Sequence, residues 1–159
     1  MNVTYALKPI GTVRVAKDGF RLLIDREYRE ALAGLEGFSH VQTVYWFHLN
    51  DSDEARSCRV SKRPYKKGPE KLGIFATRSP FRPNPIAVTP SRILEMDEAE
   101  GTIRVDYIDA EDGTPILDLK PYHPCSDRVR DAEVPKWCAH WPKCLEDNAT
   151  FDWGAEFNF

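Results

Sequence analysis

Residues 38–49, FSHVQTVYWFHL, predict a long strand rich in aromatic side chains. Successive side chains of a strand point in opposite directions, so every second residue shares one face. Val41, Thr43, Tyr45, Phe47 and Leu49 fall on one side of this run. Aromatic and β-branched residues also fit a pleated, half-buried surface better than a helix. We therefore expect a strand here.

Shorter apolar runs on both sides of this segment predict further strands. They span residues 8–15, 20–24, 72–76, 86–96, 102–108 and 115–120. The run at 102–108 alternates cleanly, which predicts that Ile103, Val105 and Tyr107 point inward. Proline cannot donate to a strand ladder, so Pro90 predicts a bulge or an edge within the strand at 86–96.

The segments that connect these predicted strands contain one hairpin turn and one helix. Asp18-Gly19 stands between two strand candidates and predicts a hairpin turn. Residues 26–35 carry apolar side chains at helical spacing, and Asp25 is placed to cap the helix. Many short strands and a single short helix therefore follow from the pattern.

This pattern favours a mainly β protein built on a small antiparallel barrel, with a sandwich as the other arrangement of this kind. Repeated strand–helix–strand units are missing, which argues against a doubly wound parallel sheet. We expect residues 1–131 to form the barrel domain. Residues 132–159 hold three tryptophans and three phenylalanines, and we expect them to form an irregular aromatic-rich arm or lid rather than an independent domain.

Composition places the chain among globular proteins. It has 159 residues, of which 42% are hydrophobic and 11% aromatic. No run approaches the ~20 apolar residues of a membrane helix, and residues 1–10 do not resemble a secretory signal. With no such signal, the four cysteines are expected to be reduced and the protein cytoplasmic. Cys125, Cys138, His140 and Cys144 match no common zinc spacing, so we expect no metal.

Positive charge is concentrated in one part of an acidic chain. The net charge is −3, yet residues 56–92 contain ten basic residues and one acid. The same stretch holds six of the twelve prolines. A charged run can be a solvated face balanced by nearby acids. Its prolines and aromatics equally support a surface for a phosphate backbone or an anionic ligand.

Within this stretch, residues 73–87 read GIFATRSPFRPNPIA and predict a stiff binding loop. Three prolines restrict the backbone before anything binds. Arg78 and Arg82 carry planar, permanently charged groups that suit phosphate or carboxylate, and Asn84 adds an amide. A loop of this composition is typical of a prepared binding surface.

Acidic residues gather in a second segment, residues 106–122, DYIDAEDGTPILDLKPY. Asp112-Gly113 reads as a turn, and Asp118 has the simple interpretation of a salt bridge. Asp109 follows a predicted strand, where a ligand role and a structural role are both open. His48 follows an aromatic run, and it is either a hydrogen-bonded core residue or a group that contacts a purine.

Three motifs together resemble the TrmO family of S-adenosylmethionine-dependent tRNA methyltransferases. They are LEGFSHV at residues 35–41, GIFATRSPFRPNPIA at 73–87 and DGTPILDLKPY at 112–122, and the resemblance extends over about residues 8–131. It implies a small β-barrel enzyme that works as a homodimer. Such an enzyme methylates N6 of threonylcarbamoyladenosine next to the tRNA anticodon.

The resemblance also implies site residues. Those expected at S-adenosyl-L-methionine are His48, Leu49, Arg78, Val88, Asp106, Tyr107, Ile108 and Asp109. Those expected at the tRNA are Arg82, Asn84 and Lys120, and the basic stretch adds Lys62 and Arg63. Asp109 or Tyr122 is our hypothesis for the group that removes the N6 proton, because methyl transfer itself requires mainly positioning.

Two departures from the family pattern leave the substrate open. Residues 13–20, VRVAKDGF, stand where the family carries a longer loop with a proline-arginine-glutamine stretch. The tryptophan-rich tail stands where a further C-terminal domain is expected. A methyltransferase acting on a small molecule and a non-catalytic nucleic-acid-binding barrel are therefore the alternatives. The second would use Tyr65 or Phe81 for base stacking.

Overall fold

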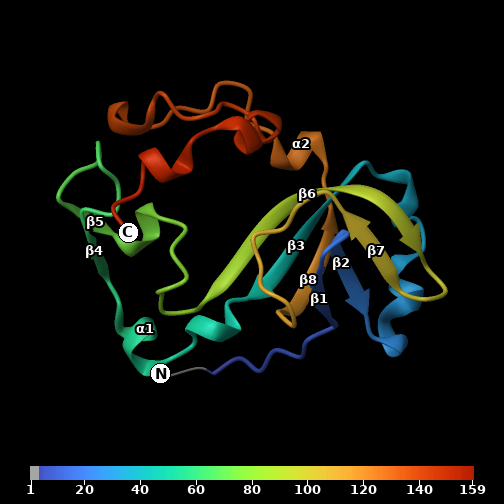
Figure 1. Cartoon of the computed structure of the whole chain (residues 1–159). Coiled ribbons are helices and arrows are strands. Elements are labelled where there is room, and N and C mark those ends of the chain that lie inside the picture. Colours follow the sequence, from blue (N-terminus) through green and yellow to red (C-terminus); the bar gives the residue numbers. More distant parts are fainter. Residues whose placement is uncertain (1–3) are drawn as a thin grey trace. The chain divides into compact units, whose positions relative to one another are not determined.

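Six antiparallel strands form a closed barrel in the computed structural model, which describes residues 4–159 (Figure 1). The strands are β1 (Gly11–Ala16), β2 (Gly19–Ile24), β3 (His40–Trp46), β6 (Ile86–Asp97), β7 (Thr102–Val105) and β8 (Pro115–Pro121). Their order around the barrel is β1-β2-β7-β6-β3-β8, and β8 pairs with β1 to close it. The prediction of a mainly β fold with a small antiparallel barrel is confirmed.

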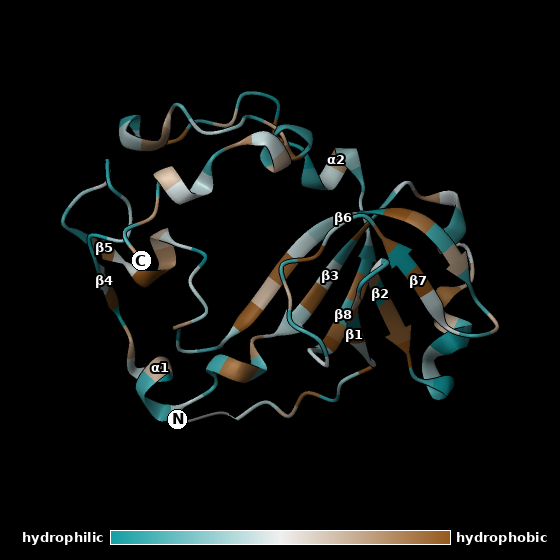
Figure 2. Ribbon diagram, viewed as in Figure 1, coloured by the Kyte–Doolittle hydropathy of each residue, from teal (hydrophilic) through white to brown (hydrophobic). Residues whose placement is uncertain are grey.

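The barrel core follows the alternation seen in the sequence. Val41, Thr43 and Tyr45 of β3 are buried, and the residues between them are half-buried. Figure 2 shows hydrophobic residues along the strands of the barrel. The residues with the least exposed side chains include Leu22, Ile103, Ile108, Ile116, Val13 and Val105.

The predicted hairpin between β1 and β2 is confirmed. Ala16 pairs with Gly19 across a two-residue turn, and Gly19 has a φ of 121°, which glycine adopts without strain. The Asp18 carboxylate pairs with the Arg21 guanidinium at 2.6 Å. Hydrogen bonding from Arg21 lowers the pKa of Asp18 to about 2.

Four strands are shorter than predicted. β1 begins at Gly11 rather than at residue 8, and the strand predicted at residues 72–76 ends at Gly73, where a 3₁₀ helix follows. The other two are β3 and β7. β3 ends at Trp46 and is followed by a 3₁₀ helix at His48–Asn50, so Leu49 does not share the buried face and is 67% exposed. β7 ends at Val105, so Tyr107 lies beyond it and is 47% exposed rather than inward. In both places the predicted alternation continues past the last ladder residue, and only pairing decides where a strand ends.

Pro90 is accommodated without a bulge of its own. It lies opposite Gln42 of β3, in the part of β6 that precedes the pairing of Ile93–Asp97 with β7. The strand has one neighbour there, as at an edge, so the missing N–H is tolerated. The register shift of β6 lies between Ile93 and Glu95 instead.

The helix predicted at residues 26–35 is present, but it is not one continuous helix. Its residues form two 3₁₀ helices, Arg26–Leu32 and Leu35–Gly37, separated at Gly34 with a φ of 86°. Asp25 makes no side-chain cap. The buried Leu32 and Leu35 are three residues apart, which suits the three-residue turn of a 3₁₀ helix.

The chain divides into two compact units. The barrel unit comprises Met1–Ser52 and Asn84–Arg128, and the second unit comprises Asp53–Pro83 and Val129–Phe159. The second unit contains α1 (Asp53–Ser57) and the two-stranded sheet of β4 (Val60–Lys62) and β5 (Lys71–Gly73). Its 3₁₀ helices are Ile74–Ala76, Lys136–Cys138, Leu145–Thr150 and Trp153–Ala155, and α2 (Pro124–Asp127) belongs to the barrel unit.

Aromatic rings from the tail surround Tyr65, which lies in the β4–β5 connection. Its ring stacks on Trp137 at a centroid distance of 5.1 Å and meets Trp141 edge-on at 5.1 Å. Tyr65 also pairs with Phe157 through an isolated β-bridge. The tail therefore packs as part of a small aromatic core, and Tyr65 is committed to that core rather than to base stacking.

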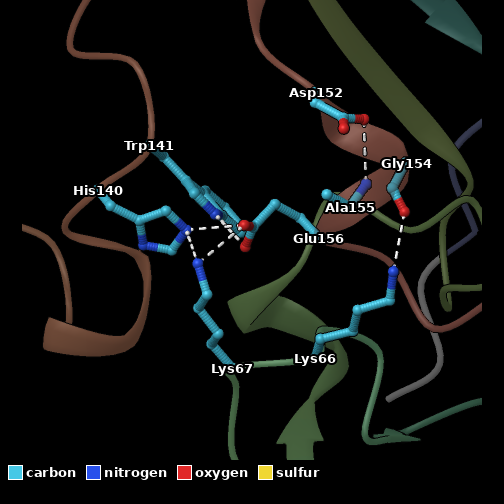
Figure 3. Close-up of polar contacts among 8 residues, drawn as sticks. All are labelled: Lys66, Lys67, His140, Trp141, Asp152, Gly154, Ala155 and Glu156. Carbon is cyan, nitrogen blue, oxygen red and sulfur yellow. Dashed lines mark hydrogen bonds and ion pairs between the residues drawn. The ribbon is translucent and has the colours of Figure 1, made fainter.

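A buried carboxylate lies at the margin of this core (Figure 3). Glu156 is 4% exposed, and its carboxylate oxygens lie 2.9 Å from His140 Nε2, 3.1 Å from Trp141 Nε1 and 3.3 Å from Lys67 Nζ. Lys66 Nζ donates to the Gly154 carbonyl at 3.0 Å. Hydrogen bonding from His140, Trp141 and Lys67 lowers the pKa of Glu156 to about 2, with His140 the largest cause.

The second unit should lose stability in acid through Glu156. Because the folded-state pKa lies below the ordinary 4.5, the stabilisation is complete above about pH 4.5 and is lost as the pH falls towards about 2. Tryptophan fluorescence during acid titration should show this step in the native chain. It should be absent in Glu156→Gln and present in Glu133→Gln, an exposed tail control. An identical acid step in Glu156→Gln would contradict this account.

Candidate functional site

The predicted site residues are divided between the two units. The barrel unit holds His48, Leu49, Asn84, Val88, Asp106, Tyr107, Ile108, Asp109, Lys120 and Tyr122. The second unit holds Lys62, Arg63, Arg78 and Arg82. Each set is therefore considered within its own unit.

Asp106 attaches the start of the 106–109 loop to β6. Its Oδ1 accepts hydrogen bonds from the backbone N–H of Arg92 at 2.8 Å and of Tyr107 at 2.7 Å. The Asp106 N–H in turn donates to the Arg92 carbonyl at 3.1 Å. This carboxylate shapes the loop, because a charged acceptor of two amide protons holds the backbone on both sides of it.

Buried hydroxyls attach the rest of the loop to the barrel interior. Ser91 Oγ donates to the Tyr107 carbonyl, and Tyr45 OH donates to the Asp109 carbonyl, both at 2.5 Å. Tyr45 OH also lies 3.0 Å from Thr89 Oγ1. These three residues were not predicted as part of the site. The available signal was the presence of hydroxyl side chains at inward positions of two strands.

The loop therefore turns two carbonyls towards the barrel and leaves two side chains outside. Between the two carbonyl anchors, Ile108 is 1% exposed and packs in the core. Tyr107 and Asp109 are exposed, and Tyr107 OH lies 3.4 Å from Asp109 Oδ1. Burial first, and then the Asp109 charge, raise the pKa of Tyr107. A phenol beside a carboxylate provides one donor and one proton acceptor on a fixed backbone.

His48 and Leu49 begin the 3₁₀ helix that follows β3. His48 Nδ1 lies 3.3 Å from Thr114 Oγ1, a hydroxyl that is 2% exposed. Leu49 is exposed, and Val88 of β6 is 39% exposed. This end of β3 therefore presents a hydrogen-bonded imidazole and accessible apolar side chains.

Tyr122 lies near the other end of β3. Its N–H donates to the His40 carbonyl at 3.0 Å, whereas Asp109 is held by Tyr45. His40 and Tyr45 are five positions apart along the strand, which corresponds to roughly 16 Å. Within this barrel the two candidate proton acceptors are therefore held by opposite ends of one strand.

The simple interpretations of the two other aspartates are confirmed. Asp112 accepts from the Val15 N–H at 2.9 Å and pairs with Arg14 at 3.1 Å beside a turn in which Gly113 has a φ of 78°. Asp118 Oδ2 lies 2.6 Å from Lys120 Nζ. Lys120 thus already has a carboxylate partner.

In the second unit, hydroxyl groups as well as prolines stiffen the 73–83 loop. Thr77 Oγ1 donates to the Ile74 carbonyl at 2.8 Å and accepts from the Ser79 N–H at 3.2 Å. Ser79 Oγ accepts from the Phe81 N–H at 3.2 Å, and Arg82 donates to the Ser79 carbonyl at 3.4 Å. Arg78 is exposed on this loop.

No group of three or more metal-ligating side chains occurs in residues 4–159. Over the same range, none of the helices has the length and apolar character needed to cross a bilayer.

A closed six-stranded antiparallel barrel with a loop anchored over it defines the class of fold. The chain belongs to the tRNA-methyltransferase O N-terminal domain family, which matches residues 7–128. An S-adenosyl-L-methionine-binding protein of Archaeoglobus fulgidus is 33% identical over 80% of this chain and 96% of its own length. The tRNA (adenine(37)-N6)-methyltransferase of Escherichia coli is 33% identical over 78% of this chain and 53% of its own length.

A crystal structure of TrmO from Pseudomonas aeruginosa has the same fold. It superposes with a TM-score of 0.66 at 29% identity over 86% of this chain. This chain covers 62% of that structure, so it spans less than two thirds of the TrmO chain and about half of the E. coli enzyme. The family resemblance read from the three motifs is confirmed.

Proposed function

We propose that this protein transfers a methyl group from S-adenosyl-L-methionine to N6 of threonylcarbamoyladenosine beside the anticodon of tRNA. The observation that carries the proposal is the family match over residues 7–128. The names of the Archaeoglobus and E. coli relatives support the cofactor and the adenine-37 N6 position for those proteins. We further propose that the enzyme is a cytoplasmic homodimer, a state that sedimentation of the purified chain would test.

The chemistry of the residues fits this cofactor. Arg78 has the charge to hold the methionine carboxylate, and the exposed Leu49 and Val88 can cover apolar parts of the adenosyl group. The anchored loop, residues 106–109, offers Tyr107 and Asp109 for hydrogen bonds, with His48 as a further candidate. The cofactor, when bound, supplies an electrophilic methyl carbon on a sulfonium.

The protein's own task is to position the adenosine and to accept a proton. As the N6 nitrogen forms its bond to the methyl carbon, the carbon–sulfur bond breaks and N6 must lose a proton. Asp109 is our choice of acceptor, because the Tyr45 anchor fixes its backbone and leaves its carboxylate exposed. Tyr122, Asn84, Lys120 and Arg82 remain candidates on the substrate side.

Calorimetry with S-adenosyl-L-methionine and a radiolabelled methyl-transfer assay test the proposal. Binding of the cofactor and labelling of tRNA that carries threonylcarbamoyladenosine are expected, with no labelling of a tRNA whose position 37 is guanosine. The absence of cofactor binding at millimolar concentration would contradict the proposed enzyme and favour the alternative of a non-catalytic nucleic-acid-binding barrel. Labelling of a tRNA with unmodified adenosine at position 37 would show that the substrate is adenosine rather than threonylcarbamoyladenosine.

Tyr45→Phe should weaken cofactor binding about tenfold, because the Asp109 carbonyl and Thr89 Oγ1 each lose a buried partner worth about 1 kcal/mol. The phenyl ring fills the same space, so the barrel should stay folded. The matched control is Thr43→Val on the same strand, since Thr43 Oγ1 is buried and has no hydrogen-bond partner among residues 4–159. Calorimetry should show wild-type affinity for the control, and equal losses in both variants would contradict the anchoring role.

A further inference from the structure

The β4–β5 hairpin presents two lysines directly opposite each other. Lys62 pairs with Lys71 in the register, and Val60 pairs with Gly73 two residues along, so these four residues lie on one face of the hairpin. All four residues on this face are exposed, whereas Ser61 and Leu72 on the other face are half-buried. Like charges directly opposite each other destabilise a strand pair. An anion bound between the two lysines would offset this repulsion.

Most basic side chains of residues 53–83 already have protein partners. This stretch has nine basic and three acidic residues. The engaged side chains are Arg56 to the Pro83 carbonyl, Arg59 to the Arg56 and Cys58 carbonyls, Arg82 to the Ser79 carbonyl, Lys66 to the Gly154 carbonyl and Lys67 to Glu156. Among the described residues, Lys62, Arg63 and Lys71 take part in no side-chain ion pair or hydrogen bond.

Arg63 has a backbone conformation that arginine rarely adopts. Its φ is +44°, and the backbone is held there because its N–H donates to the Glu70 carbonyl at 2.7 Å and its carbonyl accepts from Asn158 Nδ2 at 2.8 Å. Glycine would adopt this conformation at lower cost. Strain maintained at a position like this commonly accompanies a functional side chain.

The tail holds the hairpin in this state. Asn158 binds Arg63 and also donates its N–H to the Pro64 carbonyl at 3.1 Å, and Lys66 donates its N–H to the Glu156 carbonyl at 2.8 Å. The buried Glu156 secures Lys67, as Figure 3 shows. The whole tail, residues 132–159, lies beyond the family match that ends at residue 128, so the family match gives it no role.

We propose that the hairpin face that carries Lys62 and Lys71, together with the adjoining Arg63, binds tRNA phosphates, and that the tail serves as the scaffold of this hairpin. The proposal rests on the proposed function, since it takes the RNA substrate from there. Three cations that have no side-chain partner within residues 4–159 match the regular charge of a phosphate backbone. The two neighbouring lysines held by the tail, Lys66 and Lys67, contribute to structure instead.

Fluorescence anisotropy of a labelled tRNA transcript, measured over a series of NaCl concentrations, tests the proposal on the full chain. Lys62→Gln with Lys71→Gln should reduce affinity about tenfold and make the slope of log K against log salt shallower by about 1.4 to 1.8. Lys17→Gln with Lys136→Gln removes the same charge from exposed positions elsewhere and should leave the slope unchanged.

Arg63→Gly provides a second variant that separates binding from folding. It should keep or raise the melting temperature, because glycine relieves the strained φ, and still make the salt slope shallower by about 0.7 to 0.9. An unchanged slope in both hairpin variants overturns the inference. A change in the sedimentation of the protein alone overturns it in favour of a contact with a second copy.

The same samples separate this inference from the proposed function. Cofactor affinity by calorimetry should equal that of the wild type in both hairpin variants. If the wild-type chain binds no cofactor, the proposed function fails. If it binds the cofactor and methylates tRNA while the hairpin variants keep the full salt slope, only the phosphate-binding face is wrong.

Discussion

Asp109→Asn should lower the rate of methyl transfer by about 100-fold, the smaller end of the usual contribution of a general base. The amide keeps the size of the carboxylate and can still accept a hydrogen bond from Tyr107 OH, but it cannot take the N6 proton. The backbone carbonyl of Asp109 keeps its bond to Tyr45, so the loop should hold its position. Single-turnover methylation of tRNA, with cofactor affinity measured alongside, provides the readout.

Asp112→Asn is the matched control for this substitution. Asp112 lies three residues away and serves the turn by binding Arg14 and the Val15 N–H. Its replacement should cost about 1 kcal/mol of stability and leave the methylation rate within about twofold. A normal rate in Asp109→Asn with intact cofactor binding would remove Asp109 as the base and leave Tyr122 as the remaining candidate.

Gly11→Ala should destabilise the barrel by about 3 kcal/mol or more, because no side chain can move to make room. A Cβ at this position would lie 2.1 Å from the Leu23 carbonyl oxygen and 3.0 Å from the Ile24 Cα, and both are backbone atoms. Gly11 also pairs with Ile24 on one side and Ile116 on the other, so it lies where the barrel closes. β1 would have to move away from one partner.

Thermal unfolding followed by circular dichroism checks this expectation. For a chain of this size, 3 kcal/mol corresponds to a fall in melting temperature of roughly 6 to 12 °C. Gly37→Ala is the control, because Gly37 has no heavy atom within 4 Å of the added Cβ. Its melting temperature should be unchanged or slightly higher. Equal melting temperatures for the two variants would show that β1 can shift between its neighbours β2 and β8 without loss of stability.

The fold of the barrel could be predicted because its signals are local. The alternation around Tyr45, the turn at Asp18-Gly19 and the turn at Asp112-Gly113 each depend on a few neighbouring residues. The motif at residues 73–87 was equally visible. The type of helix at residues 26–35 could not be predicted, because apolar spacing alone does not separate a 3₁₀ helix from an α-helix when only Leu32 and Leu35 are buried.

The sequence names candidate site residues but does not give their arrangement. Asp106 was expected at the cofactor, yet its Oδ1 holds backbone N–H groups. Tyr45 was predicted only as one side of a strand and Ser91 was not singled out, although their hydroxyls hold the loop from inside the barrel. Such roles depend on carbonyl groups 16 to 64 residues away, which no local pattern reports.

By itself the sequence determined the fold class and the family, because strand alternation, turn residues and compact motifs each depend on residues that are close together in the chain. Tertiary structure alone decided where the tail packs and which cations of the basic stretch have no protein partner within residues 4–159. Glu156 and Lys67 are 89 residues apart, and Asn158 and Arg63 are 95 apart, so their pairing follows from the aromatic core that brings the tail onto the hairpin. Charge counts identify a basic region, and only these contacts separate the lysines that hold the tail from those that have no protein partner among the described residues.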